Sequence, residues 1–158
     1  MTLAKFDVRS ARTITHGYSA VMNWLVAPGR GGGVPDGERL RMDLMRALED
    51  AQEIAAQVKK KAAAYAVINV PAPVVRVLHD AATDATVLEV RSHDRVGLLH
   101  DVARAITESG VDVRAAIVST LGAEAFDILY LREVDGSALS EGHADEVVSR
   151  VEQALIDR

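Results

Sequence analysis

The sequence contains no cysteine, few aromatic residues and no long apolar segment. The lack of cysteine among its 158 residues excludes a disulfide framework and thiol catalysis. Aromatic residues make up only 4% of the chain, so we expect a core built mainly from aliphatic side chains. No run of 18 apolar residues is present, and the N-terminal stretch lacks the apolar region of a signal peptide. We therefore expect a cytoplasmic protein.

Positive charge is also in short supply, since the formal net charge is −5. This balance argues against nucleic acid or an anionic membrane as the main partner. Motifs for a nucleophile elbow, a phosphate-binding loop or paired catalytic carboxylates are missing, and the glycine run 31–33 lacks the Lys-Ser/Thr that follows in a phosphate loop. The sequence thus predicts no catalytic residue and no cofactor.

Two His-Asp dipeptides occur, at residues 93–94 and 100–101. Metal phosphohydrolases use such pairs, but they need further histidines and aspartates from other helices. The remaining histidines, at positions 16, 79 and 143, lie on predicted turns, strand ends or loops without matching spacing. We therefore predict no metal site.

The chain contains an internal repeat. Residues 6–26 align without gaps on residues 111–131, with seven identities in 21 positions. Asp7, Arg9 and Gly17 coincide with Asp112, Arg114 and Gly122. A period of about 105 residues is too long for a solenoid and indicates two copies of one small domain. A strand and a helix at residues 85–110 precede the second copy but have no counterpart before the first, so the chain resembles the tail of something longer.

Apolar periodicity and turn signals predict a sequence of short elements. Asp36 is the expected N-cap of the first helix, Gly110 the expected C′ residue of the second, and residues 27–37 form a glycine-rich loop. The predicted strands are 6–16, 18–26, 74–79, 86–91, 111–120 and 123–133, and the predicted helices are 37–65, 97–109 and 144–156.

Three stretches resemble a known family. Residues 86–100 (TVLEVRSHDRVGLLH), residues 111–130 (VDVRAAIVSTLGAEAFDILY) and the connector 74–84 are similar to the ACT domain, in particular to the paired ACT domains at the C-terminus of the bacterial PII uridylyltransferase/uridylyl-removing enzyme family. The resemblance implies an α+β, ferredoxin-like ACT sandwich of order β-α-β-β-α-β. Val96 stands where the family usually has proline.

This resemblance also implies three segments. Residues 1–66 are expected to form an N-terminally truncated ACT-like half-domain, a hairpin plus one long helix. Residues 67–84 are expected to be a linker with a short strand, and residues 85–158 a complete ACT domain. The truncated copy is expected to expose apolar surface, so we predict a homodimer, with domain swapping as one form of it.

The loop at residues 93–99 is the predicted ligand site, because a strand ends there and a helix begins with unpaired N–H groups that suit a carboxylate. Asp94 is expected to receive an ammonium group and His93 to bond a side-chain amide. An alternative is that Asp94 and Gly97 serve only the local turn and packing. By resemblance the ligand is glutamine, bound between neighbouring ACT units. The predicted site residues are His93, Asp94, Arg95, Val96, Gly97, Leu98 and Leu99, with an opposite wall from Asp112, Arg114 and Ala115.

Three functions remain open from the sequence. The first, by resemblance, is the glutamine-sensing region of an enzyme that adds or removes UMP on the PII signal protein, with its catalytic domains elsewhere. The second is a stand-alone ACT protein that dimerises and modulates another enzyme. The third is a structural ACT pair that binds no ligand.

Overall fold

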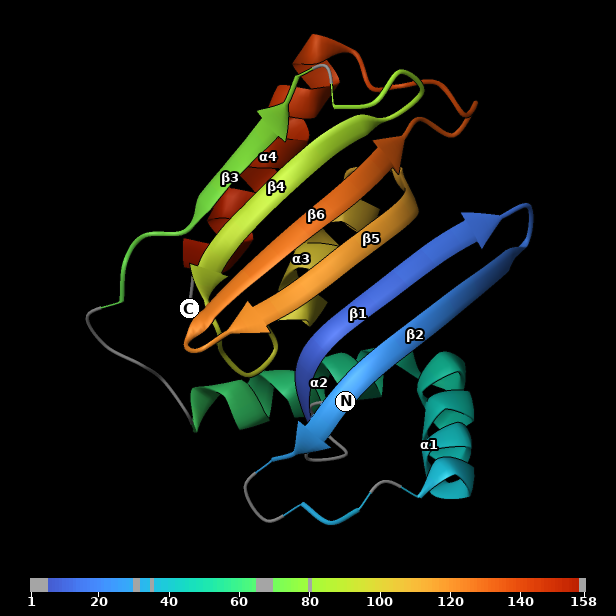
Figure 1. Cartoon of the computed structure of the whole chain (residues 1–158), viewed down its shortest axis with the longest axis vertical. Coiled ribbons are helices and arrows are strands. Elements are labelled where there is room, and N and C mark those ends of the chain that lie inside the picture. The colour runs from blue at the N-terminus through green and yellow to red at the C-terminus, as the bar shows by residue number, and fades with distance from the viewer. Residues whose placement is uncertain (1–5, 30–31, 35, 65–69, 80, 157–158) are drawn as a thin grey trace.

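The computed structural model describes residues 6–29, 32–34, 36–64, 70–79 and 81–156 (Figure 1). Elements follow one another as six strands and four helices. Their bounds are β1 Phe6–His16, β2 Ser19–Pro28, α1 Gly37–Glu49, α2 Ala51–Ala63, β3 Val74–Leu78, β4 Thr86–His93, α3 Leu98–Glu108, β5 Asp112–Leu121, β6 Glu124–Arg132 and α4 Glu141–Ile156. No helix in these ranges is long and apolar enough to cross a membrane.

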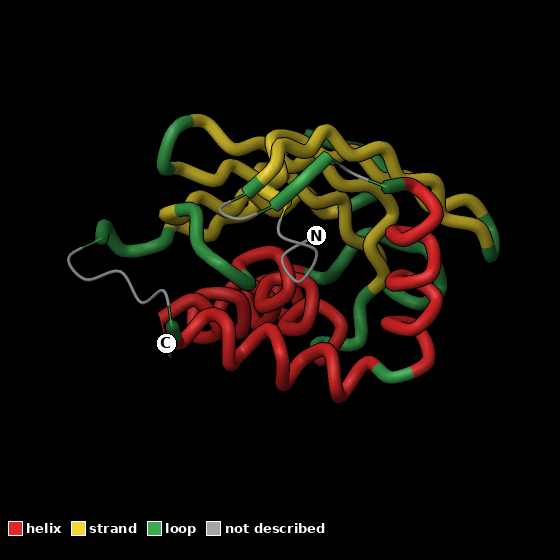
Figure 2. Tube along the Cα trace, turned by 90° about the horizontal axis from the view of Figure 1, so that it is seen from below, coloured by secondary structure: helices red, strands yellow, loops and turns green. Residues whose placement is uncertain are grey.

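All six strands form one antiparallel sheet in the order β2-β1-β5-β6-β4-β3. The helices α3 and α4 lie side by side on one face of the sheet (Figure 2). The predicted α+β ACT sandwich is confirmed. The short strand of the connector, β3, pairs with β4 and completes the four-stranded part of the sheet.

The two repeated hairpins meet through equivalent strands. Strand β1 pairs with β5 over Ser10–Ile14 and Ala115–Ser119, and Arg12 lies opposite Ile117, its own counterpart 105 residues later. This register gives the two hairpins a local two-fold relationship about that residue pair. As a result, the beginning of β1 lies beside the end of β5, close to the start of α3 (Figure 1).

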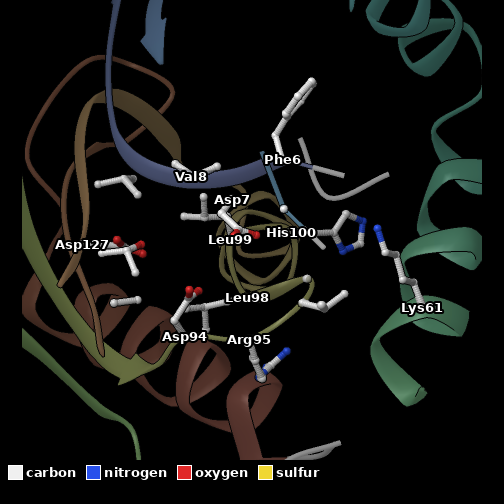
Figure 3. A pocket seen from close by; sticks show the side chains of 16 residues that line it. Phe6, Asp7, Val8, Lys61, Asp94, Arg95, Leu98, Leu99, His100 and Asp127 are labelled. Carbon is white, nitrogen blue, oxygen red and sulfur yellow. The ribbon is translucent and has the colours of Figure 1, made fainter. Parts of the chain in front are cut away.

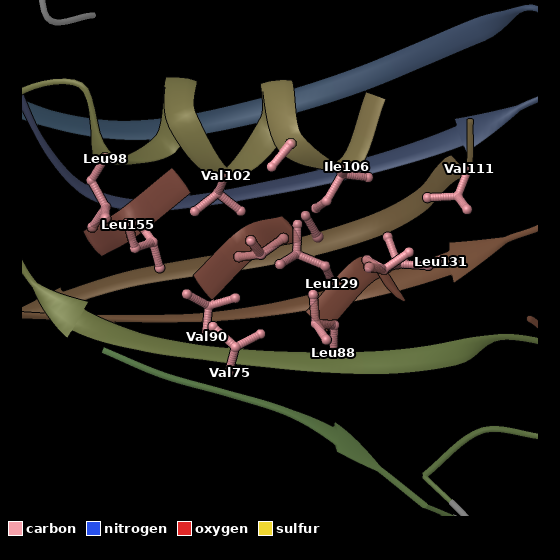
Figure 4. Packing of buried hydrophobic residues seen from close by; sticks show 14 of the residues in the cluster. Val75, Leu88, Val90, Leu98, Val102, Ile106, Val111, Leu129, Leu131 and Leu155 are labelled. Carbon is pink, nitrogen blue, oxygen red and sulfur yellow. The ribbon is translucent and has the colours of Figure 1, made fainter. Parts of the chain in front are cut away.

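The main hydrophobic cluster of the described residues lies between the strands β3 to β6 and the helices α3 and α4 (Figure 4). Leu88 and Val90 of β4 face Val102 and Ile106 of α3, and all four are at most 1% exposed. As predicted from the scarcity of aromatics, the core consists of aliphatic side chains. Its members are Val75, Leu88, Val90, Leu98, Val102, Ala105, Ile106, Val111, Ala116, Ala125, Leu129, Leu131, Val147, Val151 and Leu155.

The single helix predicted over residues 37–65 is wrong, because the chain forms two helices that meet at Asp50. The Asp50 backbone N–H donates to the Arg46 carbonyl at 3.1 Å and ends α1, while its Oδ1 accepts from the Glu53 N–H at 2.9 Å and caps α2. An aspartate that bonds its own neighbourhood in this way competes with helix continuation. Asp36 caps α1 as predicted, with Oδ1 accepting from the N–H groups of Glu38 and Arg39.

Helix α1 carries an amphipathic apolar stripe that stays exposed. It has no buried residue, and Leu44 and Leu48 are 59% and 73% exposed. In Figure 1, α1 stands beside the β1–β2 hairpin and away from the ACT unit. Its apolar face is therefore uncovered within the described chain.

Candidate functional site

The loop between β4 and α3 is held by a left-handed glycine. Gly97 has φ +85°, a conformation that side chains disfavour, and it occupies the N-cap position of α3 without any side-chain cap. The Leu98 N–H donates to the Arg95 carbonyl at 3.2 Å. Among the described residues, the N–H groups of Leu99 and His100 have no hydrogen-bond partner. These donors at the positive end of the helix favour an anionic group.

A cavity of about 420 Å³ opens at this helix start (Figure 3). Its volume lies within the usual range of small-molecule sites. Both repeats supply its walls, since the cavity lies where β1 and α2 of the first copy approach the loop of the second. The lining residues are Phe6, Asp7, Val8, Gly29, Lys61, Asp94, Arg95, Val96, Gly97, Leu98, Leu99, His100, Val118, Thr120, Ala125 and Asp127.

Charges are divided between two sides of the cavity. Figure 3 shows the carboxyl groups of Asp94 and Asp127 on one side and the Lys61 ammonium and His100 imidazole on the other. Asp7, on β1, adds a third carboxylate to the lining. The site therefore offers carboxylates on one side and an ammonium group on the other, with Arg95 beside Asp94, and groups of both signs suit a zwitterion.

Asp127 is the most unusual lining residue. It lies in the middle of β6 opposite Val118 and Val90, is 1% exposed, and neither carboxyl oxygen has a hydrogen-bond partner among the described residues. Burial raises the pKa of Asp127 to about 7, and the negative charge of Asp94 acts in the same direction. The nearby backbone amide of Ser119, which is outside hydrogen-bonding geometry, offsets only part of the rise.

Asp94 is also affected by its surroundings. Loss of solvent at the cavity wall raises the pKa of Asp94, and the carboxylate of Asp7 raises it further, while His93 and Arg9 partly oppose the rise. The Asp94 backbone N–H donates to the Ala123 carbonyl at 2.8 Å, which ties the loop to the β5–β6 turn. Asp94 and Asp127 thus raise each other's energy when both are ionised, and a cation placed between them would relieve the repulsion.

An ion pair joins the glycine loop to the first turn of α3. Arg95 donates to the fully buried Asp101 at 2.7 Å, and the Nδ1 of His100 lies 3.6 Å from the same carboxyl group. Placing a carboxylate in a low-dielectric environment costs several kcal/mol, and the ion pair with Arg95 offsets part of that cost for Asp101. Arg95 therefore fixes the loop as well as lining the cavity.

The structure brings together six of the predicted site residues, all in the glycine loop: Asp94, Arg95, Val96, Gly97, Leu98 and Leu99 line the cavity. His93 does not line it, although it is adjacent in the chain, because it is the last residue of β4 and pairs with Glu124.

The wall predicted from Asp112, Arg114 and Ala115 is absent from the cavity. These residues begin β5, at the far end of that strand from the loop, and Arg114 donates to the Thr15 carbonyl. The wall comes instead from the equivalent strand of the first copy, where Asp7 is the repeat counterpart of Asp112. In this cavity the strand position predicted from Asp112 is thus occupied by its repeat counterpart on β1.

Asp127 and Lys61 line the cavity but were not among the predicted site residues. Asp127 lies in the stretch 111–130 that carries the family resemblance, and an aspartate in the middle of a predicted strand was the available signal. Lys61 lies in a lysine run that is typical of a solvated helix end, so its sequence gave no sign of the cavity. Only the tertiary packing of α2 reveals it.

The His-Asp dipeptides do not form a metal centre in the described part of the chain, where no group of three or more potential ligands converges. His93 and Asp94 flank the end of a strand, and His100 and Asp101 take part in the ion-pair cluster of the loop.

Comparison with known proteins relates this geometry to a family. Residues 86–153 match the ACT domain family. The chain is 40% identical over 138 residues to the bifunctional uridylyltransferase/uridylyl-removing enzyme of Streptomyces coelicolor, covering 85% of this chain and 16% of that protein. It is 30% identical over 167 residues to the enzyme of the same name from Azospirillum brasilense, covering 99% of this chain and 18% of that protein.

The chain thus spans less than a fifth of the length of these relatives. No solved structure matches it significantly.

Proposed function

Because residues 86–153 belong to the ACT domain family and the chain is homologous to the C-terminal region of bifunctional uridylyltransferase/uridylyl-removing enzymes, we propose that it is the part of such an enzyme that senses glutamine. The observation that carries the proposal is the two-sided cavity at the start of α3. It combines helix N–H donors with carboxylates in one cavity of about 420 Å³.

An α-amino acid fits the chemistry of the two sides. Its carboxylate is placed at the N–H groups of Leu99 and His100, on the side of Lys61. Its ammonium group is placed near Asp94 and Asp127. His93 lies outside the cavity, so another lining residue must hydrogen-bond the side-chain amide of the ligand. Thr120 lines the cavity and carries a hydroxyl group that can do so.

The position of the cavity supports a regulatory role. The ligand would contact β1 and α2 of the first copy and the loop of the second, so its binding favours the arrangement in which the two are close. In the parent enzyme we propose that this arrangement biases the addition or removal of UMP on the PII protein according to the glutamine level. A bound ligand regulates only through such a difference in affinity between two states.

Calorimetric titration with glutamine, with glutamate and serine as controls, tests the proposal. We expect selective binding of glutamine that Asp94→Ala weakens at least tenfold, with the fold confirmed by circular dichroism. Absence of heat with every amino acid, from a folded protein, would contradict the sensing role and favour a structural ACT pair. Selective binding of another amino acid would favour a different regulatory ACT protein.

A further inference from the structure

The cavity extends beyond the glycine loop to the buried carboxyl group of Asp127 on strand β6. A carboxyl group that is 1% exposed and has no partner is costly unless something fulfils its bonding capacity. Asp127 lies between Ala125 and Leu129 on the strand face that points to the helices, where an apolar residue would pack without cost. Among the described residues the Asp127 carboxyl oxygens therefore have unused acceptor capacity, which a donor bound in the cavity would satisfy.

We propose that Asp127 is the specificity-determining residue of the site and accepts the ammonium group of the ligand. The proposal rests on the amino-acid site proposed above and adds the residue that selects a free amino group. Asp94, in the glycine loop, is the second carboxylate that lines the cavity and acts on Asp127. An uncharged or acylated amine leaves Asp127 without its partner, which is the usual way a buried polar group rejects an analogue.

Binding is then linked to proton release. Because the free Asp127 is about half protonated at neutral pH, an ammonium ligand binds the ionised form and displaces the proton. The affinity for an ammonium ligand therefore rises with pH, by about tenfold between pH 6 and pH 8 for a single group that titrates near pH 7. Other charged groups facing the cavity are Asp7, Asp94, Arg95, His100 and Lys61.

Calorimetry with three compounds tests the assignment: glutamine, its analogue without the amino group (glutaramic acid), and its analogue without the carboxyl group (4-aminobutanamide). We expect about tenfold tighter binding of glutamine and 4-aminobutanamide at pH 8 than at pH 6, and proton release seen as a dependence of the heat on the buffer. Asp127→Asn should weaken both amines at least tenfold and remove the pH dependence, while glutaramic acid binds both proteins equally weakly.

Two variants serve as controls. Asp112→Asn makes the same change on β5, outside the cavity, and should leave binding unchanged. His100→Gln removes the histidine that faces the cavity and should retain the rise in affinity with pH. A pH dependence that persists in Asp127→Asn but disappears in His100→Gln would overturn the proposal. Thermal unfolding of each variant verifies that it is folded.

A second measurement separates this proposal from the choice of ligand. Carbon-13 NMR of the aspartate carboxyl groups follows the titration of Asp127 directly, with Asp127→Asn providing the assignment. Added methylammonium chloride should lower the apparent pKa of Asp127, even if the protein binds no glutamine. An unchanged Asp127 titration at saturating glutamine or methylammonium would refute the assignment while leaving glutamine binding itself intact.

Discussion

Single side chains fix the ends of the ACT-domain helices, and His143 is the clearest case. Its Nδ1 lies 2.7 Å from Glu133 Oε1 and its Nε2 lies 3.0 Å from the Ser109 carbonyl, so the ring bridges α4, the end of β6 and the C-terminus of α3. The hydrogen bond to Glu133 raises the pKa of His143, the Ser109 carbonyl adds to the rise, and burial opposes it. A cation there also complements the negative end of α3.

The stability supplied by His143 should depend on pH. Because its folded pKa is above the ordinary 6.5, the contribution is fully present below that value and is lost as pH rises through the folded pKa. We expect His143→Gln to lose roughly 1 to 2 kcal/mol of unfolding free energy at pH 5.5 and much less at pH 9. Denaturant unfolding at both pH values measures this.

The exposed His79, at the end of β3, provides the matched control for that experiment. His79→Gln should change the unfolding free energy little at either pH. An equal loss at pH 5.5 and pH 9 in His143→Gln would show that the ring acts by packing alone.

Among the helices and strands, local sequence determines the hairpin turns but not the break between α1 and α2. Both hairpins turn at glycines with positive φ, Gly17 and Gly122, and both were predictable because few other residues adopt that conformation. The break at Asp50 was not predictable from periodicity, since the apolar stripe continues across it. The choice between one helix and two depends on whether the aspartate side chain bonds its neighbours.

The Asp50 cap gives a prediction for this pair of helices. Asp50→Ala removes the acceptor of the Glu53 N–H, so the unfolding free energy should fall by about 1 kcal/mol, and Asp50→Asn should retain most of it. Denaturant unfolding followed by circular dichroism measures the effect, with Asp43→Ala inside α1 as control. Higher helicity with unchanged stability in Asp50→Ala would mean that the two helices merge.

The candidate site shows the same contrast between local and tertiary information. The glycine loop was predictable because its residues are contiguous and their chemistry is that of a helix start. The opposite wall depends on which strand lies next to β5, and that register is a tertiary property of the β1–β5 pairing. The repeat located Asp7 and Asp112 as equivalents, but the sequence contained no signal for which of them faces the loop.

In the described chain, residues 74–156 are well packed and residues 6–63 are more open. The apolar residues of the first copy are largely exposed, with Val21 at 67% and Leu25 at 62% on β2, and Leu44 and Leu48 likewise on α1. Exposed apolar surface of this kind is typical of an interaction face.

We expect this surface to cause self-association of the chain. Sedimentation velocity should show a dimer at micromolar concentration, and the double variant Leu44→Glu, Leu48→Glu should shift it to monomer without changing the fold. Lys60→Glu, on the exposed side of α2, is a control for added charge. If the wild-type chain is monomeric at all accessible concentrations, self-association through this surface is contradicted.

The pairing between β1 and β5 has a consequence for local opening of the chain. Five residue pairs join these strands, ten join β1 to β2, and no member of the core cluster comes from residues 6–63. The hairpin therefore separates from the sheet at a lower free energy than the core unfolds, and its amide protons exchange with solvent in an earlier, smaller event. A molecule bound between β1 and the glycine loop would slow the separation of β1 from β5. The amide-exchange rate of the β1–β2 hairpin would therefore report how much of the site is occupied.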